Sequence, residues 1–509
     1  MEESLGELTP AVDEAHARAR ELVARIAARD HTVWQDDPTE VADRLGWLDA
    51  PEVAGRVAPD LRRLAQGVVA DGFTDVVVVG MGGSSLFPEV LAHTFGPAPD
   101  HPTVHVLDTT DPRAVLETEA RLPWDRTLLV PASKSGTTIE MRCLQSRLGE
   151  RLAEARPSAA DAMVAITDPG TVLEEQARAG GWREVVPAPA DVGGRFSALT
   201  VFGLLPAALL GRDLSGLVDP AGELLVRALA DEGGEGDPVR LGALLAAAAR
   251  AGRDKLTLLL PADAPGLGAW IEQLVAESTG KHGVGILPVL GEEADADRFG
   301  DDRLVVALGD HAGLDAVADA GHPVARLPWS GPGGLGVEVM RWELATAVAG
   351  ALLELNPFDQ PDVAAAKAAT SRVLEQGGDL PGFDDPKKAL ASLVPGGYVA
   401  LLGFVTPNGT DHAALEAAAT SLREHTSAPV TLGVGPRYLH STGQLHKGGP
   451  DGGVYLVTVG EDPEDAEIPG EEGLTFSRLK RAQAAGDLEA LRAAGRNAAH
   501  LAPDGIAYL

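Results

Sequence analysis

The stretch Thr127-Leu-Leu-Val-Pro-Ala-Ser-Lys-Ser-Gly-Thr-Thr-Ile-Glu140 says more about the fold than any other part of this 509-residue chain. Its first four residues form an apolar run typical of a buried parallel strand, and Glu140 opens a helical stretch. A helix cap uses one hydroxyl group, whereas several hydroxyls, a glycine and the free N–H groups of a helix suit a phosphate monoester. We therefore predict a phosphate-binding loop here, with these candidate ligands: Ser133, Lys134, Ser135, Thr137 and Thr138.

A glycine-rich loop follows another apolar run, Asp75–Val79, and reads Gly80-Met-Gly-Gly-Ser-Ser85. Glycines let a backbone approach an anion closely, which makes Gly83 and Ser84 further candidate phosphate ligands. The pattern also nearly matches the dinucleotide fingerprint, with Asp108 as the ribose-binding acid. However, Asp108 lies 28 residues beyond the first glycine, where the fingerprint places the acid after about 20. Because a dinucleotide fold has no use for a second phosphate loop, we interpret the two loops as one phosphate site.

Short apolar runs alternate with helical patterns along the rest of the chain, which predicts βαβ units and doubly wound, mainly parallel sheets. The expected fold class is α/β, with two such sheet domains, helices before them and a C-terminal α/β segment after them. Changes of pattern and a linker-like stretch at 377–386 place the boundaries at 1–70, 71–252, 253–376 and 377–509. The expected strands are 75–79, 104–107, 128–130, 163–166, 256–260, 283–290, 304–308, 324–327, 398–404, 430–433 and 454–459.

The formal net charge is −33, from 75 acidic and 42 basic residues. Nucleic acids and anionic membranes bind basic surfaces, so we expect neither as a partner. The single cysteine, Cys143, excludes an intramolecular disulfide and a cysteine-based zinc site. The N-terminus lacks the basic and apolar parts of an export signal, and no apolar run approaches the roughly 20 residues that span a bilayer. These features predict a cytoplasmic protein, and the lack of an H-E-x-x-H pattern predicts no catalytic metal.

Five motifs between residues 76 and 370 occur in the order typical of the SIS (sugar isomerase) superfamily, and they specifically resemble glucose-6-phosphate isomerases. They are Gly80-Met-Gly-Gly-Ser-Ser85, Ser133-Lys-Ser-Gly-Thr-Thr138, Gly193-Gly-Arg-Phe-Ser197, Gln273-Leu-Val-Ala-Glu-Ser-Thr-Gly-Lys281, and Asn356-Pro-Phe-Asp-Gln-Pro-Asp-Val363 leading to Lys367. The stretch Pro436-Arg-Tyr-Leu-His-Ser-Thr-Gly-Gln-Leu-His-Lys-Gly-Gly-Pro450 resembles the isomerase half of bifunctional transaldolase/glucose-6-phosphate isomerase proteins. Because the chain is too short to hold a transaldolase barrel as well, the resemblance is to a stand-alone isomerase.

The resemblance implies two α/β/α SIS domains with the active site at their interface, usually completed by the second subunit of a homodimer. It also implies an aldose–ketose isomerase of glucose 6-phosphate and fructose 6-phosphate, a reaction of glycolysis and gluconeogenesis, that uses no metal or redox cofactor. Carried over position by position, the phosphate ligands are Ser84, Ser133, Ser135 and Thr138, with Gly83, Lys134 and Thr137 in the same loops. The residues implied at the reacting carbons and the substrate are Arg195, Glu277 as the base, Gln273 and Lys367.

This reaction moves a proton between carbons 2 and 1 of an open sugar chain, through an enediolate intermediate. A carboxylate can shuttle that proton, but the carbon acid is too weak unless a fixed cation stabilises the enediolate oxygens. Glu277 and Arg195 fit these roles; the alternatives are a solvated helix carboxylate and an arginine that bridges loop carbonyls. Lys367, in an Ala-rich helix, fits a role in ring opening or at the ring oxygen, and its alternative is to keep that helix soluble.

The chain departs from the family in its histidines. Typical members carry a ring-opening histidine in a Gly-Gln-His segment between the base and the late lysine. That interval holds three histidines, none of them after Gly-Gln: His282, His311 and His322. A Gly443-Gln444 pair occurs further on, between His440 and His446, so we predict that this C-terminal loop supplies the ring-opening group. The sequence leaves His440 and His446 equally open, keeps His282 as the next candidate, and also allows a loop that only covers the pocket.

Three other functions fit parts of the pattern. A dual phosphoglucose/phosphomannose isomerase would differ only in the configuration tolerated at carbon 2, which the shape of the pocket decides. A non-catalytic SIS protein that senses a sugar phosphate would keep both loops but need neither Glu277 nor Lys367. A nicotinamide-dependent dehydrogenase would need the glycine-rich loop but not the hydroxyl-rich one.

Overall fold

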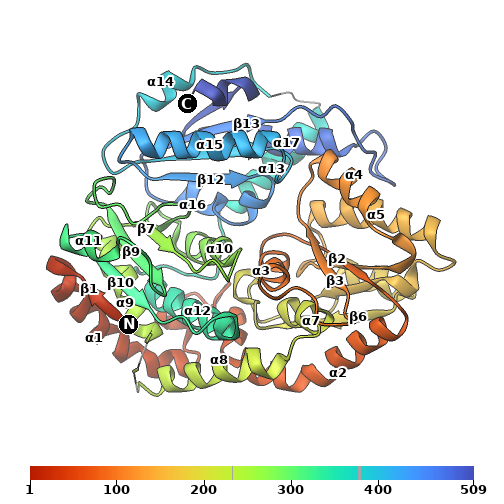
Figure 1. Cartoon of the computed structure of the whole chain (residues 1–509), viewed down its shortest axis with the longest axis horizontal. Helices are drawn as coiled ribbons and strands as arrows, with labels where there is room; N and C mark the ends of the chain where they lie inside the picture. The colour runs from red at the N-terminus through yellow and green to blue at the C-terminus, as the bar shows by residue number, and fades with distance from the viewer. Residues whose placement is uncertain (232, 235, 377–379, 509) are drawn as a thin grey trace.

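The computed structural model describes residues 1–231, 233–234, 236–376 and 380–508, except for the side chains of residues 363–367, 376, 507 and 508. The strands gather in three regions, each covered by helices, and the C-terminal region lies at the top of Figure 1. Nearly all neighbouring strands are parallel, and helices connect them. The predicted fold class, α/β with doubly wound sheets, is confirmed.

The first sheet contains the two predicted phosphate loops. Its strands run parallel in the order β3 (Thr103–Leu107), β2 (Asp75–Val79) and β4 (Thr127–Pro131). Isolated bridges from β4 continue it into the parallel pair β5 (Val164–Thr167) and β6 (Glu184–Pro187). The sequence does not predict β6, because it has one buried residue and ends in proline. The helices of this region are α3 (Leu86–Phe95), α4 (Pro112–Arg121), α5 (Ile139–Ala155) and α6 (Val172–Ala179).

The second sheet has the order β1 (Glu2–Ser4), β10 (Val324–Leu327), β9 (Arg303–Leu308), β7 (Lys255–Leu259) and β8 (Leu287–Val289). Strands β7 to β10 run parallel near the predicted positions, although β8 covers only part of the predicted strand 283–290, and β1 pairs antiparallel with β10. The sequence predicts only helices before residue 70, and the structure adds β1 at their start. Nothing marks β1 in the sequence, because it is three residues long and two of them are glutamates.

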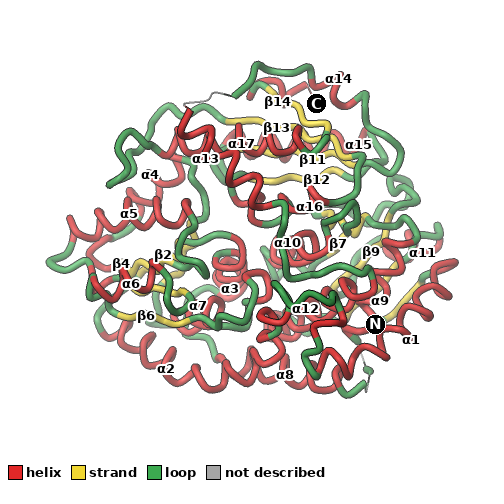
Figure 2. Tube along the Cα trace, turned by 180° about the vertical axis from the view of Figure 1, so that it is seen from behind, coloured by secondary structure: helices red, strands yellow, loops and turns green. Residues whose placement is uncertain are grey.

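The third sheet is parallel throughout, in the order β12 (Val430–Val434), β11 (Tyr398–Phe404), β13 (Gly453–Val459) and β14 (Asn497–Leu501). Alternate residues of β11 belong to two apolar clusters, one shared with α15 (Thr410–His425) and the other with α17 (Phe476–Ala493). These helices cover opposite faces of the sheet (Figures 1 and 2). The sequence predicts α15 and three of these strands, but not α17 and β14, in which charged or polar residues interrupt the apolar pattern.

Helices join the three regions. Helix α9 (Pro238–Arg250) packs against α1 (Thr9–Ala27) and α12 (Leu335–Leu352), and α2 (Ala50–Ala70) packs against α7 (Val201–Leu209) and α8 (Leu214–Leu229). The predicted boundaries of the four parts therefore stay a proposal, because β1 and α1 pack with elements of other parts. The remaining helices are α10 (Leu267–Thr279), α11 (Leu314–Asp319), α13 (Val363–Gln376), α14 (Pro386–Leu390) and α16 (Gly443–Gly448). No described helix combines the length and the apolar character needed to cross a membrane.

Candidate active site

One cavity of about 370 Å³ brings together residues from both phosphate loops, from α10 and from the C-terminal stretch. It lies beyond the carboxyl ends of β2 and β4, where the first sheet meets α10 and the turn η10 (Arg437–His440). Doubly wound sheets bind their ligands at this end of the strands. The predicted site residues that line it are Gly83, Ser84, Ser133, Lys134, Ser135, Thr138, Arg195, Gln273, Glu277 and His440.

The hydroxyls of the loop after β4 form a connected group. Ser133 Oγ lies 3.1 Å from Thr138 Oγ1 and accepts a hydrogen bond of 3.1 Å from the backbone N–H of Gly136. Gly136 has φ +68°, a conformation that favours glycine, so this residue sets the curve of the loop. Ser135 Oγ lies 2.9 Å from Thr137 Oγ1, and Thr137 lines a neighbouring cavity of about 220 Å³ instead of this one. The loop therefore offers Ser133, Ser135 and Thr138 to the cavity.

The ammonium group of Lys134 is already held by the protein. It lies 2.5 Å from Asp168 Oδ2 and donates a bond of 2.9 Å to the carbonyl oxygen of Ala190. Burial raises the pKa of Asp168, although Lys134 acts in the opposite direction. Lys134 thus connects the phosphate loop to the end of β5 and to the loop after β6.

The glycine-rich loop owes its glycines to contacts with other motifs. A Cβ at Gly83 would lie 1.9 Å from the carbonyl oxygen of Gly194, and a Cβ at Gly82 would lie 2.6 Å from Gln273 Nε2. Both positions must stay free of a side chain for the loop to reach the Gly193-Gly194-Arg195 motif and α10. The sequence predicts anion binding for this loop, and the structure gives its glycines this second role.

Glu277 and Arg195 form a buried ion pair at the wall of the cavity. Arg195 Nη1 lies 3.0 Å from Glu277 Oε1, and Gln273 Nε2 donates a bond of 3.2 Å to Glu277 Oε2. The rest of the guanidinium donates to Ser278 Oγ at 2.9 Å and to the carbonyl oxygen of Pro357 at 2.7 Å. The base, the cation and the substrate-contacting glutamine that the resemblance implies are thus in direct contact.

Lys281 is a buried residue of this site whose role the sequence did not indicate. Its ammonium bonds the carbonyl oxygen of Asn356 at 2.6 Å and Asp359 Oδ1 at 2.5 Å, and Arg195 Nη2 donates to the carbonyl oxygen of Asp359 at 2.7 Å. Burial, followed by the nearby Arg195 charge, lowers the pKa of Lys281 to about 8. Lys281 and Arg195 therefore both bond the segment 356–359, which precedes α13. The available signal was that Lys281 is one of few lysines and closes the motif of the base.

His440 reaches the cavity and pairs with a carboxylate of the first sheet region. His440 Nε2 lies 2.9 Å from Glu140 Oε1, and the His440 carbonyl oxygen accepts a bond of 2.8 Å from Gln273 Nε2. Glu140 is 4% exposed and also accepts a bond of 2.7 Å from Gln483 Nε2 of α17. The sequence does not indicate Glu140 or Gln483 as site residues, although Glu140 directly follows the phosphate loop.

The structure does not bring His446 or His282 to the cavity. Tyr398 Oη lies 3.0 Å from His446 Nδ1, and the ring of Tyr455 packs edge-on against the histidine. Burial, followed by the charges of Lys447 and Arg496, lowers the pKa of His446 to about 3. His282 is exposed. The predicted C-terminal loop is in fact the turn η10 and the short helix α16, and only the former faces the cavity.

The predicted residue Lys367 belongs to α13, but its side chain lies outside the described residues. The helix begins at Val363, four residues after Asp359, whose carbonyl oxygen Arg195 and Lys281 both bond. Within the part of the chain that the structure describes, no three His, Cys, Asp or Glu side chains are grouped as metal ligands.

Residues 15–282 match the family model described as Phosphoglucose isomerase. The glucose-6-phosphate isomerase of Rubrobacter xylanophilus is 30% identical over 410 residues, which cover 69% of this chain and 92% of the relative. That of Gloeothece citriformis is 29% identical over 397 residues, 65% of this chain and 74% of the relative. The match to the family model includes four of the five quoted motifs and ends before the turn that carries His440.

Two solved structures share the fold. A hypothetical protein, TT0462, from Thermus thermophilus superposes with a TM-score of 0.61 at 26% identity, over 72% of this chain and 98% of its own. A glucose-6-phosphate isomerase from Chlamydia trachomatis superposes with a TM-score of 0.61 at 18% identity, over 75% of this chain and 88% of its own. Both leave about a quarter of this chain unmatched.

Proposed function

The chain belongs to the phosphoglucose isomerase family and interconverts glucose 6-phosphate and fructose 6-phosphate, and from this premise we propose that the reaction takes place in the cavity of about 370 Å³. One observation carries the proposal. A carboxylate–guanidinium pair, a histidine and a group of hydroxyls line the same space, and the histidine bonds Glu140, which lines the neighbouring cavity of about 220 Å³. A cyclic sugar phosphate needs these three functions: proton transfer at carbon, ring opening and phosphate binding.

At the phosphate end, we assign binding to Ser84, Ser133, Ser135 and Thr138, with Gly83 as the backbone approach. The hydroxyls of Ser133 and Thr138 already lie within hydrogen-bond distance of each other, so they can converge on one anion. Lys134 holds the loop in place through its ion pair with Asp168, and Thr137 supports Ser135 from the neighbouring cavity. Together these groups build a local anion site in a protein of net charge −33.

At the reacting carbons, Glu277 removes the proton from carbon 2 and returns one to carbon 1. Arg195 stabilises the enediolate oxygens, and its geometry is suited to this because its other N–H groups are fixed on Ser278 and Pro357. A cation held in place before the reaction needs no reorganisation when charge develops. Gln273 supports the pair, since its amide bonds both Glu277 and the turn of His440.

His440 opens the ring. Its Nε2 faces Glu140, so in the neutral ring the proton belongs on Nε2 and the lone pair of Nδ1 is the basic site. Nδ1 can accept the proton of the carbon 1 hydroxyl and return it to the ring oxygen, which breaks the ring C–O bond and forms the aldehyde. Glu140 orients the ring for this exchange, as a carboxylate commonly does for a catalytic histidine. Lys367 stays a proposed partner at the ring oxygen, on the resemblance alone.

We assign the ring-opening group to the C-terminal part of this chain, where the sequence predicts it. His440 and Glu140 come from the same polypeptide, so each chain provides the acid–base pair whose histidine lines its own cavity. We retain the homodimer and the cytoplasmic location as proposals, and assign the second subunit no role in ring opening. Specific activity should accordingly stay constant on dilution through the dimer dissociation range.

A coupled assay of the purified protein tests the proposal. Glucose 6-phosphate and fructose 6-phosphate should interconvert without added metal, and prior dialysis against EDTA should not change the rate. Mannose 6-phosphate serves as the second substrate, because turnover of it would identify a dual phosphoglucose/phosphomannose isomerase. Binding of glucose 6-phosphate without turnover would contradict the proposed roles of Glu277 and His440.

A further inference from the structure

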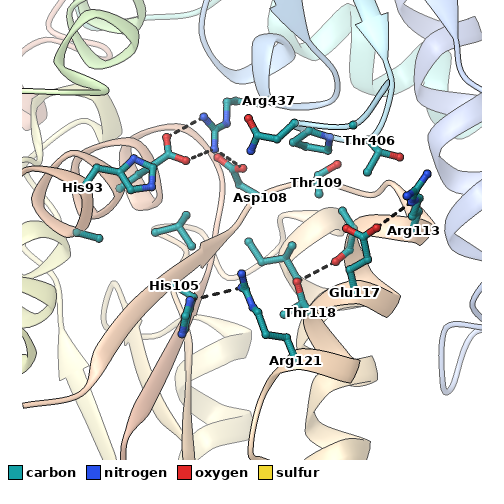
Figure 3. Close-up of a pocket in the computed structure, with 18 of the residues that line it drawn as sticks. His93, His105, Asp108, Thr109, Arg113, Glu117, Thr118, Arg121, Thr406 and Arg437 are labelled. Atoms are coloured by element: carbon teal, nitrogen blue, oxygen red, sulfur yellow. Dashed lines mark hydrogen bonds and ion pairs between the residues drawn. The ribbon is translucent and has the colours of Figure 1, made fainter. Parts of the chain in front are cut away.

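The turn η10 that carries His440 is fixed to the first sheet region at its first residue. The guanidinium of Arg437 bonds both oxygens of Glu89 at 2.8 Å and donates a further bond of 2.8 Å to Asp108 Oδ1. Figure 3 shows Arg437 reaching from the C-terminal part to Asp108, in the wall of a third cavity of about 630 Å³. A bidentate arginine–carboxylate pair fixes orientation as well as contributing energy.

The two carboxylates depend on this arginine. Glu89 lies in α3, the helix after the glycine-rich loop, and Asp108 follows β3 directly. Asp108 is 4% exposed, and its Oδ2 has no hydrogen-bond partner among the described groups. Without Arg437, the carboxylates of Glu89 and Asp108 would lie close together, at least partly buried and without this cation. Such an arrangement destabilises the folded protein. The need to pair Glu89 and Asp108 therefore keeps Arg437, and with it the turn η10, at this position on the first sheet region.

We propose that Arg437 is a positioning residue for ring opening, because its hydrogen bonds to Glu89 and Asp108 fix the position of the His440 ring. Arg437 and His440 are three residues apart in one 3-10 turn, and this spacing places two side chains on the same side. Both side chains bond carboxylates of the first sheet region. The inference rests on the ring-opening role proposed for His440.

The other contacts of the turn cannot replace this one. Tyr438 Oη donates a bond of 2.7 Å to Asp487 of α17, which belongs to the same C-terminal part, and the His440 carbonyl oxygen bonds Gln273 of α10. Among the hydrogen bonds described for the turn, those of Arg437 and of the His440 ring itself reach the first sheet region. The hydrogen bond between His440 and Glu140 changes as the histidine takes up and releases a proton. The bonds of Arg437 do not take part in this transfer, so they hold the turn against the first sheet region throughout the reaction.

Ring opening can be measured separately from proton transfer at carbon. Opening and reclosing the ring interconverts the α and β anomers of glucose 6-phosphate, and NMR exchange spectroscopy measures that rate. In a Glu277→Gln background, anomer exchange is the reaction that remains. We expect Arg437→Met to slow catalysed exchange about tenfold or more, since a displacement of about 1 Å can cost about a hundredfold. The saturation constant for glucose 6-phosphate should change less than about twofold, because the phosphate ligands are elsewhere.

Two further variants separate positioning from general stability. Arg437→Lys keeps the charge but not the two parallel bonds, and it should recover part of the lost rate. Arg423→Met is the matched control, because Arg423 ties the same C-terminal part to the second sheet region through the carbonyl oxygens of Leu290 and Gly291. Anomer exchange in this control should stay at the level of the Glu277→Gln parent.

If Arg437→Met folds poorly, Glu89→Gln weakens the same contact from the other side and leaves the bond to Asp108 in place. A selective loss of anomer exchange in either variant supports the inference. Unchanged exchange in both Arg437→Met and Glu89→Gln would overturn it. Unchanged exchange in His440→Ala would instead overturn the ring-opening role of His440, so failure of the inference and failure of the proposed function give different results.

Discussion

The turn η10 and helix α16 present two histidines, His440 and His446, that are six residues apart in the sequence and have opposite surroundings. The His440 ring lines the active-site cavity and bonds Glu140, which arrives from α5 of the first sheet region. The His446 ring lies among the aromatic rings of the third sheet, where Tyr398 and Tyr455 enclose it. The local sequence does not separate the two residues; the elements packed against them do.

This difference decides which histidine can transfer a proton. A ring-opening group must take up and release a proton near neutral pH while it touches the substrate. Burial, followed by the charges of Lys447 and Arg496, lowers the pKa of His446 to about 3, so that ring stays neutral inside the protein. His440 has a carboxylate partner and access to the cavity. The position of a histidine next to a family motif therefore indicates a catalytic role only when the residues packed around its ring are also known.

The largest expected effect is that of Glu277→Gln, which removes the base but leaves both histidines in place. Isomerisation should fall by about a thousandfold or more, since removing general acid–base catalysis typically costs about a hundredfold to ten-thousandfold. The loss should be equal for glucose 6-phosphate and for a four-carbon aldose phosphate that cannot cyclise. Steady-state kinetics on both substrates measure this, with Glu272→Gln in the same helix as the control. A loss confined to the cyclic substrate would move Glu277 to ring opening.

His440→Ala tests the histidine comparison directly. We expect about a hundredfold lower kcat/KM with glucose 6-phosphate, because the enzyme then depends on slow ring opening in solution. The four-carbon aldose phosphate should lose less than about fivefold, since its chain is already open and Glu277 is intact. Rates with both substrates check this, and His282→Ala, an exposed histidine, serves as the control. Equal losses on both substrates would show that His440 does not act in ring opening.

Ser133→Ala and Thr138→Ala change the part of the site that both substrates share. Each variant should raise KM by about tenfold, because a hydrogen bond to a charged group contributes about 1.5–3 kcal/mol. The value of kcat should stay within about twofold, since the phosphate is held alike in the ground and transition states. Kinetics on the cyclic and the open-chain substrate should show the same rise. Thr420→Ala is the control, because this exposed hydroxyl of α15 bonds the carbonyl oxygen of Glu416 within its own helix. An unchanged KM in both variants would mean that the loop does not bind phosphate.

The sequence predicts best those parts of the molecule in which the residues of a strand are followed directly by the residues of the site. Strands β2 and β4 are apolar runs that end in glycine- or hydroxyl-rich loops, so strand and site are found together. Strand β1 and helix α17 lack such signals, because their burial depends on partners far along the chain. The contact between Glu140 and His440 spans 300 residues, and no local pattern indicates it.

His446 is expected to have the smallest effect on activity and a distinct effect on stability. His446→Gln keeps a hydrogen-bonding side chain beside Tyr398 but removes the titrating ring. Catalysis on the cyclic and the open-chain substrate should stay within about twofold of the wild type, because His446 does not line the cavity. A selective loss with glucose 6-phosphate would return the ring-opening role to His446.

The stability of the two proteins should diverge in acid. The folded chain holds His446 neutral down to a pKa of about 3, whereas the unfolded chain takes up a proton on this side chain below about pH 6.5. Protonation therefore favours the unfolded state, and stability is lost as the pH falls from about 6.5 towards 3. At pH 5 this cost is about 2 kcal/mol of the free energy of unfolding, from about 1.4 kcal/mol per pH unit.

Urea unfolding at pH 7 and pH 5 measures this cost. Between these two pH values the free energy of unfolding should fall by about 2 kcal/mol less in His446→Gln than in the wild type. His282→Gln, at an exposed position, should match the wild type at both values. The same acid sensitivity in His446→Gln and the wild type would mean that His446 is accessible to protons, and the contrast between the two histidines would then rest on Glu140 alone.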